Sequence, residues 1–267
     1  MKDKIAGLFS GIEFKKRNEI FALMQDWEKT ISTSEIVFKD DNKKYKGNEY
    51  FNYDGFFPGY YENKPKVLFI GREARGVSGL DFIGANIEYF KNESSLNNVS
   101  FWRRIFCMYN IIRNNGVIDK NITADQIADS MIEKNNYGFA LMNISKYSND
   151  SETGAKRDKT LMNRFLEDSK LDQRNFIKEE LKILDPDLII TAHLWDGTIN
   201  KEYMEKIFGE IEFITKVVVQ SNWVASLNNF YFESKVIKLI DLFHFSRPGV
   251  SDMEYYYKPI SKLLKKI

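Results

Sequence analysis

Four short apolar runs, each followed by polar residues, alternate with amphipathic segments along this 267-residue chain. The runs are 66–71, 137–143, 187–192 and 236–243. Apolar runs of this length between turn residues are typical of buried strands. Strands that alternate with helices predict a parallel sheet with helices on both faces. We therefore expect an α/β fold with three layers, α/β/α, around a mostly parallel, four-stranded central sheet.

Two segments of the chain are ambiguous. In the run 236–243 the apolar spacing also suits one face of a helix, but the Ser-Arg-Pro sequence at 246–248 favours a strand that leaves the sheet into a loop. Segment 211–220 is a further candidate strand.

The remaining segments complete the expected organisation. Helices are expected at 5–31, 99–114, 123–133, 160–183, 200–208 and 254–265, with Thr123 or Asn121 as the cap of the third. Segment 40–64 is rich in aromatic residues, and 145–158 is a polar loop. We expect two parts: residues 1–64, an N-terminal helix and aromatic loop extension, and residues 65–267, the α/β domain.

Composition narrows the classes of protein that the chain could represent. A formal net charge of +1 means that any binding of nucleic acid must depend on a local basic patch. The single cysteine, Cys107, excludes an intramolecular disulfide, a cysteine-based zinc site and a protein-bound iron–sulfur cluster. No apolar run approaches membrane-spanning length, and no signal-peptide core follows residues 1–4. We expect a cytoplasmic protein with no membrane partner.

Polar residues follow each of the four expected strands. Glu73 comes after the first strand, Asn143 ends the second, and the only two histidines, His193 and His244, follow the third and fourth. The carboxyl ends of parallel strands meet at one edge of a sheet, where ligands bind. A carboxylate, a carboxamide and an imidazole together can activate water, bind a planar hydrogen-bonding edge and stabilise a developing anion.

Each of these residues also has an ordinary structural role open to it. Glu73 could be solvated or paired with a neighbouring arginine, Asn143 could cap a turn, and His193 could pack beside the site. The Gly-bounded segment 71–76 lacks the Lys-Ser/Thr ending of a phosphate-binding loop.

Three motifs in this order resemble those of the uracil-DNA glycosylase superfamily. They are Gly-Arg-Glu-Ala-Arg-Gly at 71–76, Ala-Leu-Met-Asn at 140–143 and His-Phe-Ser at 244–246. The family has Gly-Glu-Ala-Pro-Gly or a related sequence in the first place, an Asn in the second and His-Pro-Ser in the third. The sequence Ile-Leu-Asp-Pro-Asp-Leu-Ile-Ile at 183–190 resembles the start of the family's third strand, so the resemblance covers about residues 66–250.

The resemblance implies a role for each matching residue. Glu73 falls at the position of the water-activating residue, and His244 falls at that of the histidine that stabilises the departing base. Asn143 would bind the Watson–Crick edge of a base extruded from the helix, and Phe82 is the candidate for stacking on that base.

The resemblance also implies the surroundings of the site. Gly71, Ser246 and Arg247 would complete the substrate-binding set, and His193 would support the pocket. No metal or other cofactor is implied. The expected partner is single- or double-stranded DNA, bound through local basic residues at 72, 75, 156 and 157.

The chain departs from the family's pattern at three positions. Ala74 and Phe245 replace prolines, and Glu73 is one methylene longer than an aspartate. Two other functions therefore stay open, since a fold does not fix a function. One is a non-catalytic module that binds nucleic acid or a nucleotide, and the other is a small-molecule hydrolase whose pocket the aromatic residues of 45–61 line.

Overall fold

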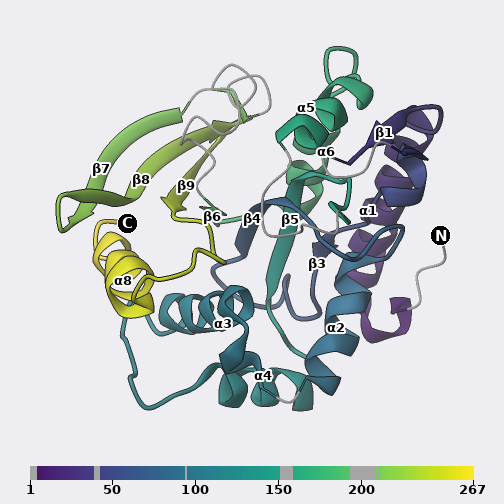
Figure 1. Cartoon of the computed structure of the whole chain (residues 1–267). Coiled ribbons are helices and arrows are strands. Elements are labelled where there is room, and N and C mark those ends of the chain that lie inside the picture. The colour runs from purple at the N-terminus through teal and green to yellow at the C-terminus, as the bar shows by residue number, and fades with distance from the viewer. Residues whose placement is uncertain (1–4, 39–42, 94, 151–158, 193–207, 210) are drawn as a thin grey trace.

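The computed structural model describes residues 5–38, 43–93, 95–150, 159–192, 208–209 and 211–267, and its centre is one large sheet (Figure 1). The strands of this sheet are β3 (Gly55–Phe56), β4 (Val67–Glu73), β5 (Phe139–Ser145), β6 (Leu188–Ala192), β7 (Ile211–Val219), β8 (Asn222–Phe232) and β9 (Lys235–Leu242). Their spatial order is β3-β5-β4-β6-β9-β8-β7.

The four expected strands are the parallel centre of the sheet. β4 pairs in parallel with both β5 and β6, and β6 pairs in parallel with β9. The expected number of strands was wrong, because the described residues form a sheet of seven strands. β3 adds to β5, and β8 and β7 add beyond β9, all in antiparallel pairing. The ambiguous segments at 211–220 and 236–243 both form strands.

Helices cover both faces of the central strands, which explains why β5 is buried along its whole length. The helices are α1 (Gly11–Thr30), α2 (Phe82–Asn92), α3 (Ser100–Arg113), α4 (Ala124–Glu133), α5 (Lys159–Asp168), α6 (Phe176–Leu184) and α8 (Lys258–Leu264). In Figure 1, α3, α4 and α8 lie together below the sheet, and α5 and α6 lie above it.

Aromatic contacts join the helices to the sheet and to one another. On the α3 side, the rings of Phe106 and Tyr109 lie 5.9 and 5.4 Å from the ring of Phe139 on β5. In the other helical group, Trp27 of α1 stacks on Phe176 of α6 with ring centroids 5.1 Å apart. Large rings such as these supply much of the apolar area that stabilises each layer.

Two expected helices differ from those observed. The segment 160–183 forms two helices, because Lys170 adopts a left-handed φ of 50° and Asn175 caps α6 by accepting a hydrogen bond from the Lys178 N–H. The segment 5–31 starts with a 3₁₀ turn at Ala6–Leu8, and α1 begins only at Gly11.

Other elements also differ from the expectation or settle an alternative that the sequence left open. The chain enters α8 through a π-helical turn, Met253–Tyr257. Thr123, and not Asn121, caps α4, in a capping box with Gln126. Helix α2 and the small hairpin of β1 (Glu35–Val37) and β2 (Lys44–Lys46) were not expected. Of the expected helix at 200–208, residues 200–207 lie outside the described residues.

The aromatic segment before β4 is part of the core. Its fully buried rings are Phe51, Tyr53, Phe56, Phe57 and Tyr60. Part of this segment, β3, also pairs with β5. In the described part of the chain, no helix is both long enough and apolar enough to cross a bilayer.

Trp27 provides a test of this packing. It is 0 % exposed, whereas Trp223 on β8 is 52 % exposed. We expect Trp27→Ala to lower the free energy of unfolding by about 3–5 kcal/mol, because it leaves a cavity between α1 and α6. The matched control Trp223→Ala should cost less than about 1 kcal/mol. Urea denaturation of both variants measures the difference, and equal losses would contradict the packing.

Candidate functional site

The strand register brings the expected site residues to one end of the sheet. Ile70 is level with Thr191 on β6, and Thr191 is level with Asp241 on β9. Glu73 lies three residues after Ile70, and His244 lies three residues after Asp241. Both residues are therefore at the carboxyl end of the parallel strands, two strand spacings or about 10 Å apart in the plane of the sheet.

Gly71 and Asn143 form the part of the site between β4 and β5. They are register partners, and both side-chain positions lie on the same face of the sheet. A Cβ atom on Gly71 would lie only 2.4 Å from Asn143 Oδ1, so the carboxamide rests directly against the glycine backbone. The Asn143 backbone N–H donates a hydrogen bond of 2.6 Å to Asp54 Oδ2. Both the backbone and the side chain of Asn143 are thus fixed in position.

Glu73 is oriented at the end of β4 by two side chains. Its own side chain is only 4 % exposed. Its Oε1 accepts a hydrogen bond of 3.1 Å from Asn149 Nδ2 and lies 3.4 Å from an Arg75 nitrogen. The pairing with a neighbouring arginine, which the sequence left open, is therefore present. It supplies a counter-charge for a carboxylate that is largely withdrawn from water.

The imidazole of His244 has a defined hydrogen-bonding state. Its Nδ1 accepts a hydrogen bond of 3.3 Å from the Ser246 backbone N–H and lies 2.9 Å from Ser246 Oγ. When Nδ1 accepts, the proton of the neutral ring is on Nε2. The half-buried ring therefore offers an N–H donor at the end of β9.

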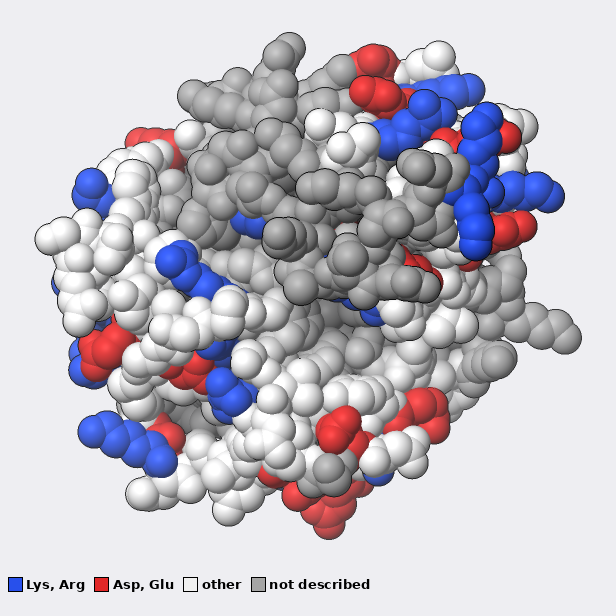
Figure 2. All heavy atoms as spheres, in the orientation of Figure 1, with Lys and Arg blue, Asp and Glu red and all other residues white. Residues whose placement is uncertain are grey.

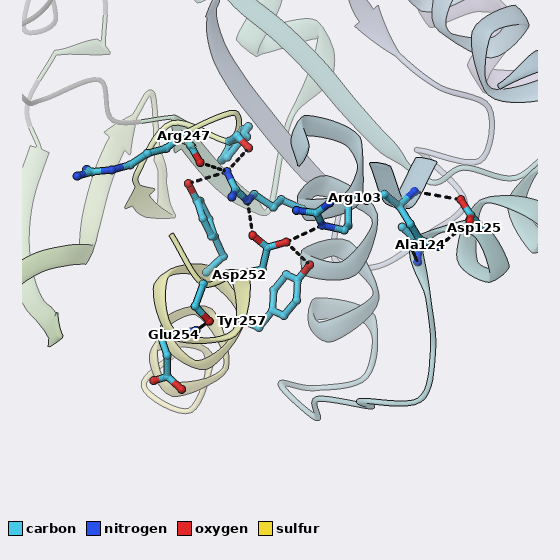
Figure 3. Close-up of polar contacts among 12 residues, drawn as sticks. Arg103, Ala124, Asp125, Arg247, Asp252, Glu254 and Tyr257 are labelled. Carbon is cyan, nitrogen blue, oxygen red and sulfur yellow. Dashed lines mark hydrogen bonds and ion pairs between the residues drawn. The ribbon is translucent and has the colours of Figure 1, made fainter. Parts of the chain in front are cut away.

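Arg104 of α3 holds the turn that carries His244. This guanidinium is 2 % exposed and donates hydrogen bonds of 2.8 Å to the carbonyl oxygens of Phe245 and Arg247. It also pairs with Asp252 at 2.7 Å. In Figure 3, Asp252 lies between Arg103 and Tyr257, which contact its carboxylate as well.

Phe245 has a structural role in the same turn. Its ring is fully buried, 5.9 Å from the ring of Phe69 on β4 and 5.9 Å from that of Phe101 on α3. The buried ring therefore stabilises the turn through packing, whereas a proline would do so by fixing the φ angle.

Other predicted residues lie elsewhere or outside the described residues. Phe82 is buried in the first turn of α2, and no described contact joins it to Glu73 or Asn143. Arg247 is exposed, with its guanidinium 3.9 Å from the ring centroid of Phe243, and Figure 3 shows it pointing away from the Asp252 cluster. His193 lies outside the described residues.

The expected basic surface is only partly described. Arg72 is buried, Arg75 pairs with Glu73, and Lys156 and Arg157 lie outside the described residues. On the face drawn in Figure 2, Lys and Arg side chains are interleaved with Asp and Glu, and the largest group lies at upper right, over the region of α1 and β1. The described side chains on this face form no extended patch of one sign.

Metal-ligating side chains and known relatives are two further sources of evidence on function. Within the described ranges, no three His, Cys, Asp or Glu residues lie close enough to hold a metal ion. No protein-family model and no curated protein matches this chain. The basis for assigning a function is therefore the arrangement of the site residues themselves.

The sequence did not indicate three residues that shape the site. Asp54 is in the aromatic segment, Asn149 is in the polar loop after β5, and Arg104 is in α3. A charged residue on the apolar stretch of α3 is the only sequence signal among them. Asp54 and Asn149 act through contacts with residues 89 and 76 positions away, which no local pattern reveals.

Gly71 tests the geometry of Asn143. In Gly71→Ala the new methyl group must displace the carboxamide, because the 2.4 Å separation from Oδ1 is too short for non-bonded atoms. We expect the side-chain amide resonances of Asn143 to shift in a ¹H–¹⁵N spectrum. The control is Gly7→Ala, since nothing lies within 4 Å of a Cβ at Gly7. An Asn143 resonance that Gly71→Ala leaves in place would contradict this geometry.

Arg104 tests the support of the His244 turn. Arg104 bonds Asp252 through Nε and both carbonyl oxygens through Nη1, and the single nitrogen of Lys cannot occupy both places at once. We expect Arg104→Lys to speed hydrogen exchange of the amides at 245–248 and to cost about 1–3 kcal/mol of stability. Arg103→Lys is the matched control, because Arg103 contacts the same Asp252 without touching the turn. Faster exchange in both variants would argue against a specific role for Arg104.

Proposed function

We propose that this protein is a divergent enzyme of the uracil-DNA glycosylase type, which hydrolyses the N-glycosidic bond of a base extruded from DNA. One observation carries the proposal: a carboxylate, a carboxamide and an imidazole lie at the same end of the parallel strands. Each is oriented by a second group, Glu73 by Asn149, Asn143 by Asp54 and His244 by Ser246. Side chains that act in a functional site are typically held in position by supporting hydrogen bonds of this kind.

The chemistry assigned to Glu73 is that of a general base. Its carboxylate takes a proton from a water molecule as the water oxygen bonds to C1′ of the sugar. The bond from C1′ to the base nitrogen breaks, and its electron pair leaves with the base. Arg75 and Asn149 keep the carboxylate in one orientation for this step.

His244 and Asn143 act on the leaving base. The Nε2–H of the neutral imidazole donates a hydrogen bond to the oxygen on which negative charge develops, and this bond strengthens as the charge grows. The Asn143 carboxamide offers one donor and one acceptor group side by side. This pair is complementary to adjacent N–H and C=O groups, so a base with such an edge, like uracil or hypoxanthine, is the preferred substrate.

A non-catalytic module that binds a nucleotide is the second candidate. The ion pair between Glu73 and Arg75 favours it, because a paired carboxylate is a weaker base. The third alternative, a small-molecule hydrolase, loses the feature that motivated it, because the most buried rings of the segment 45–61 are used in core packing.

Base release from oligonucleotides tests the proposal. Duplex and single-stranded substrates, each with one uracil, hypoxanthine or alkylated base, are incubated with the protein, and abasic sites are cleaved with alkali. We expect release from at least one substrate and a loss of about 10²- to 10⁴-fold in Glu73→Gln. The matched control Glu88→Gln removes an exposed carboxylate on α2 and should keep full activity.

The outcomes separate the two candidates. Binding of the same oligonucleotides that persists in Glu73→Gln, with no base released by the wild type, would favour the binding module. Base release that Glu73→Gln leaves unchanged would reject the role of Glu73.

A further inference from the structure

Three ionisable side chains are buried together behind the end of β5. Lys146, Asp54 and Glu180 are each at most 1 % exposed. Lys146 Nζ lies 2.7 Å from Asp54 Oδ1 and 2.7 Å from Glu180 Oε2. The three come from separate parts of the chain: Asp54 directly precedes β3, Lys146 follows β5, and Glu180 is on α6. Burying such groups is costly unless their charges balance.

Charge balance in this cluster requires a proton on one of the two carboxyl groups. Burial and the nearby Asp54 raise the pKa of Glu180 well above its usual value, although Lys146 opposes the change. Burial alone would lower the pKa of Lys146, but Asp54 and Glu180 outweigh this effect and raise it. With a proton on Glu180, the cluster as a whole carries one positive and one negative charge.

The cluster is connected directly to the candidate site. Asp54 uses its Oδ1 for Lys146 and its Oδ2 for the backbone N–H of Asn143, at 2.6 Å. A hydrogen bond to an ionised acceptor is shorter and stronger than one to a neutral acceptor. The backbone of Asn143 is thus held from one side by Asp54, while its carboxamide lies against Gly71.

We infer that Asp54 is a positioning residue for Asn143, and that Lys146 and Glu180 together hold the Asp54 carboxylate in one direction. The three side chains do not touch the substrate. They set where the Asn143 carboxamide stands, and so which base edge it fits. Asn143 contacts a base only if the proposed function holds, whereas the buried cluster is a property of the fold itself.

The first measurement needs no substrate. The backbone amide proton of Asn143 should resonate far downfield in the wild type, because its acceptor is charged and close. We expect Asp54→Asn to move this resonance upfield. Glu180→Gln should leave it in place, since Gln is neutral, has nearly the same shape, and its side-chain oxygen can still accept the hydrogen bond from Lys146. The control Asp81→Asn breaks another buried ion pair, with Arg17, and should not affect Asn143.

The second measurement is base release by the same variants. Asp54→Asn should lower kcat by about tenfold to 100-fold, with a smaller change in KM, because a displaced Asn143 no longer matches the transition state. Glu180→Gln should stay close to the wild type. An equal fall in Asp81→Asn would show that lost stability alone explains the effect, and it would overturn the inference.

The two proposals fail in different ways. A wild type that releases no base contradicts the proposed function and leaves the amide measurement valid. An Asn143 amide that does not move in Asp54→Asn contradicts the positioning role, whatever the activity is.

The protonation of Glu180 supplies a test that holds even if Asp54→Asn does not fold. The groups that face Glu180 are Asp54 and Lys146. The side-chain carboxyl ¹³C shift of wild-type Glu180 should titrate above the usual range of a glutamate pKa, and titration within that range would overturn the inference. A raised pKa in the folded state gives stability that is complete below the usual pKa, 4.5, and is lost as the pH rises through the folded value. Glu180→Gln should remove this loss.

Discussion

The parallel pairing of β4 with both β5 and β6 is the constraint on which the rest of the structure depends. This pairing brings the carboxyl ends of three strands to the same edge of the sheet, and the pairing of β6 with β9 adds the carboxyl end of a fourth strand. Polar residues that are more than 170 positions apart in the chain, Glu73 and His244, thereby share one edge. The helices on either face connect these strands and bury them. The position of the candidate site at this edge is therefore a consequence of the order of the strands in the sheet.

The sequence predicted the parts of this fold in which local pattern and final environment agree. The central strands β4, β5 and β6 are buried on both faces, so they read as continuous apolar runs, whereas β9 is only partly buried. β8 was missed because it carries Ser226 and Asn228, which are buried and hydrogen-bonded to each other, where the pattern requires apolar residues. The break between α5 and α6 was missed for a related reason: a left-handed Lys170 has no distinctive sequence signal.

The same reasoning applies to the candidate site. The common location of Glu73, Asn143 and His244 could be predicted because each lies near the carboxyl end of a recognisable strand. Asp54 and Arg104 could not, because their contacts join distant segments, 141 positions apart for Arg104 and Phe245. Residues that position a site through tertiary contacts are visible only once the chain is folded.

Phe245 makes the conformation of the turn that carries His244 depend on the packing of the core. A proline at this position would restrict the backbone through its own ring, whatever the surrounding protein does. Phe245 restricts it only while Phe69 and Phe101 stay packed around it. A change that loosens the packing between β4 and α3 would therefore also weaken the support of the imidazole, which would then depend on the hydrogen bonds that Arg104 donates to the turn.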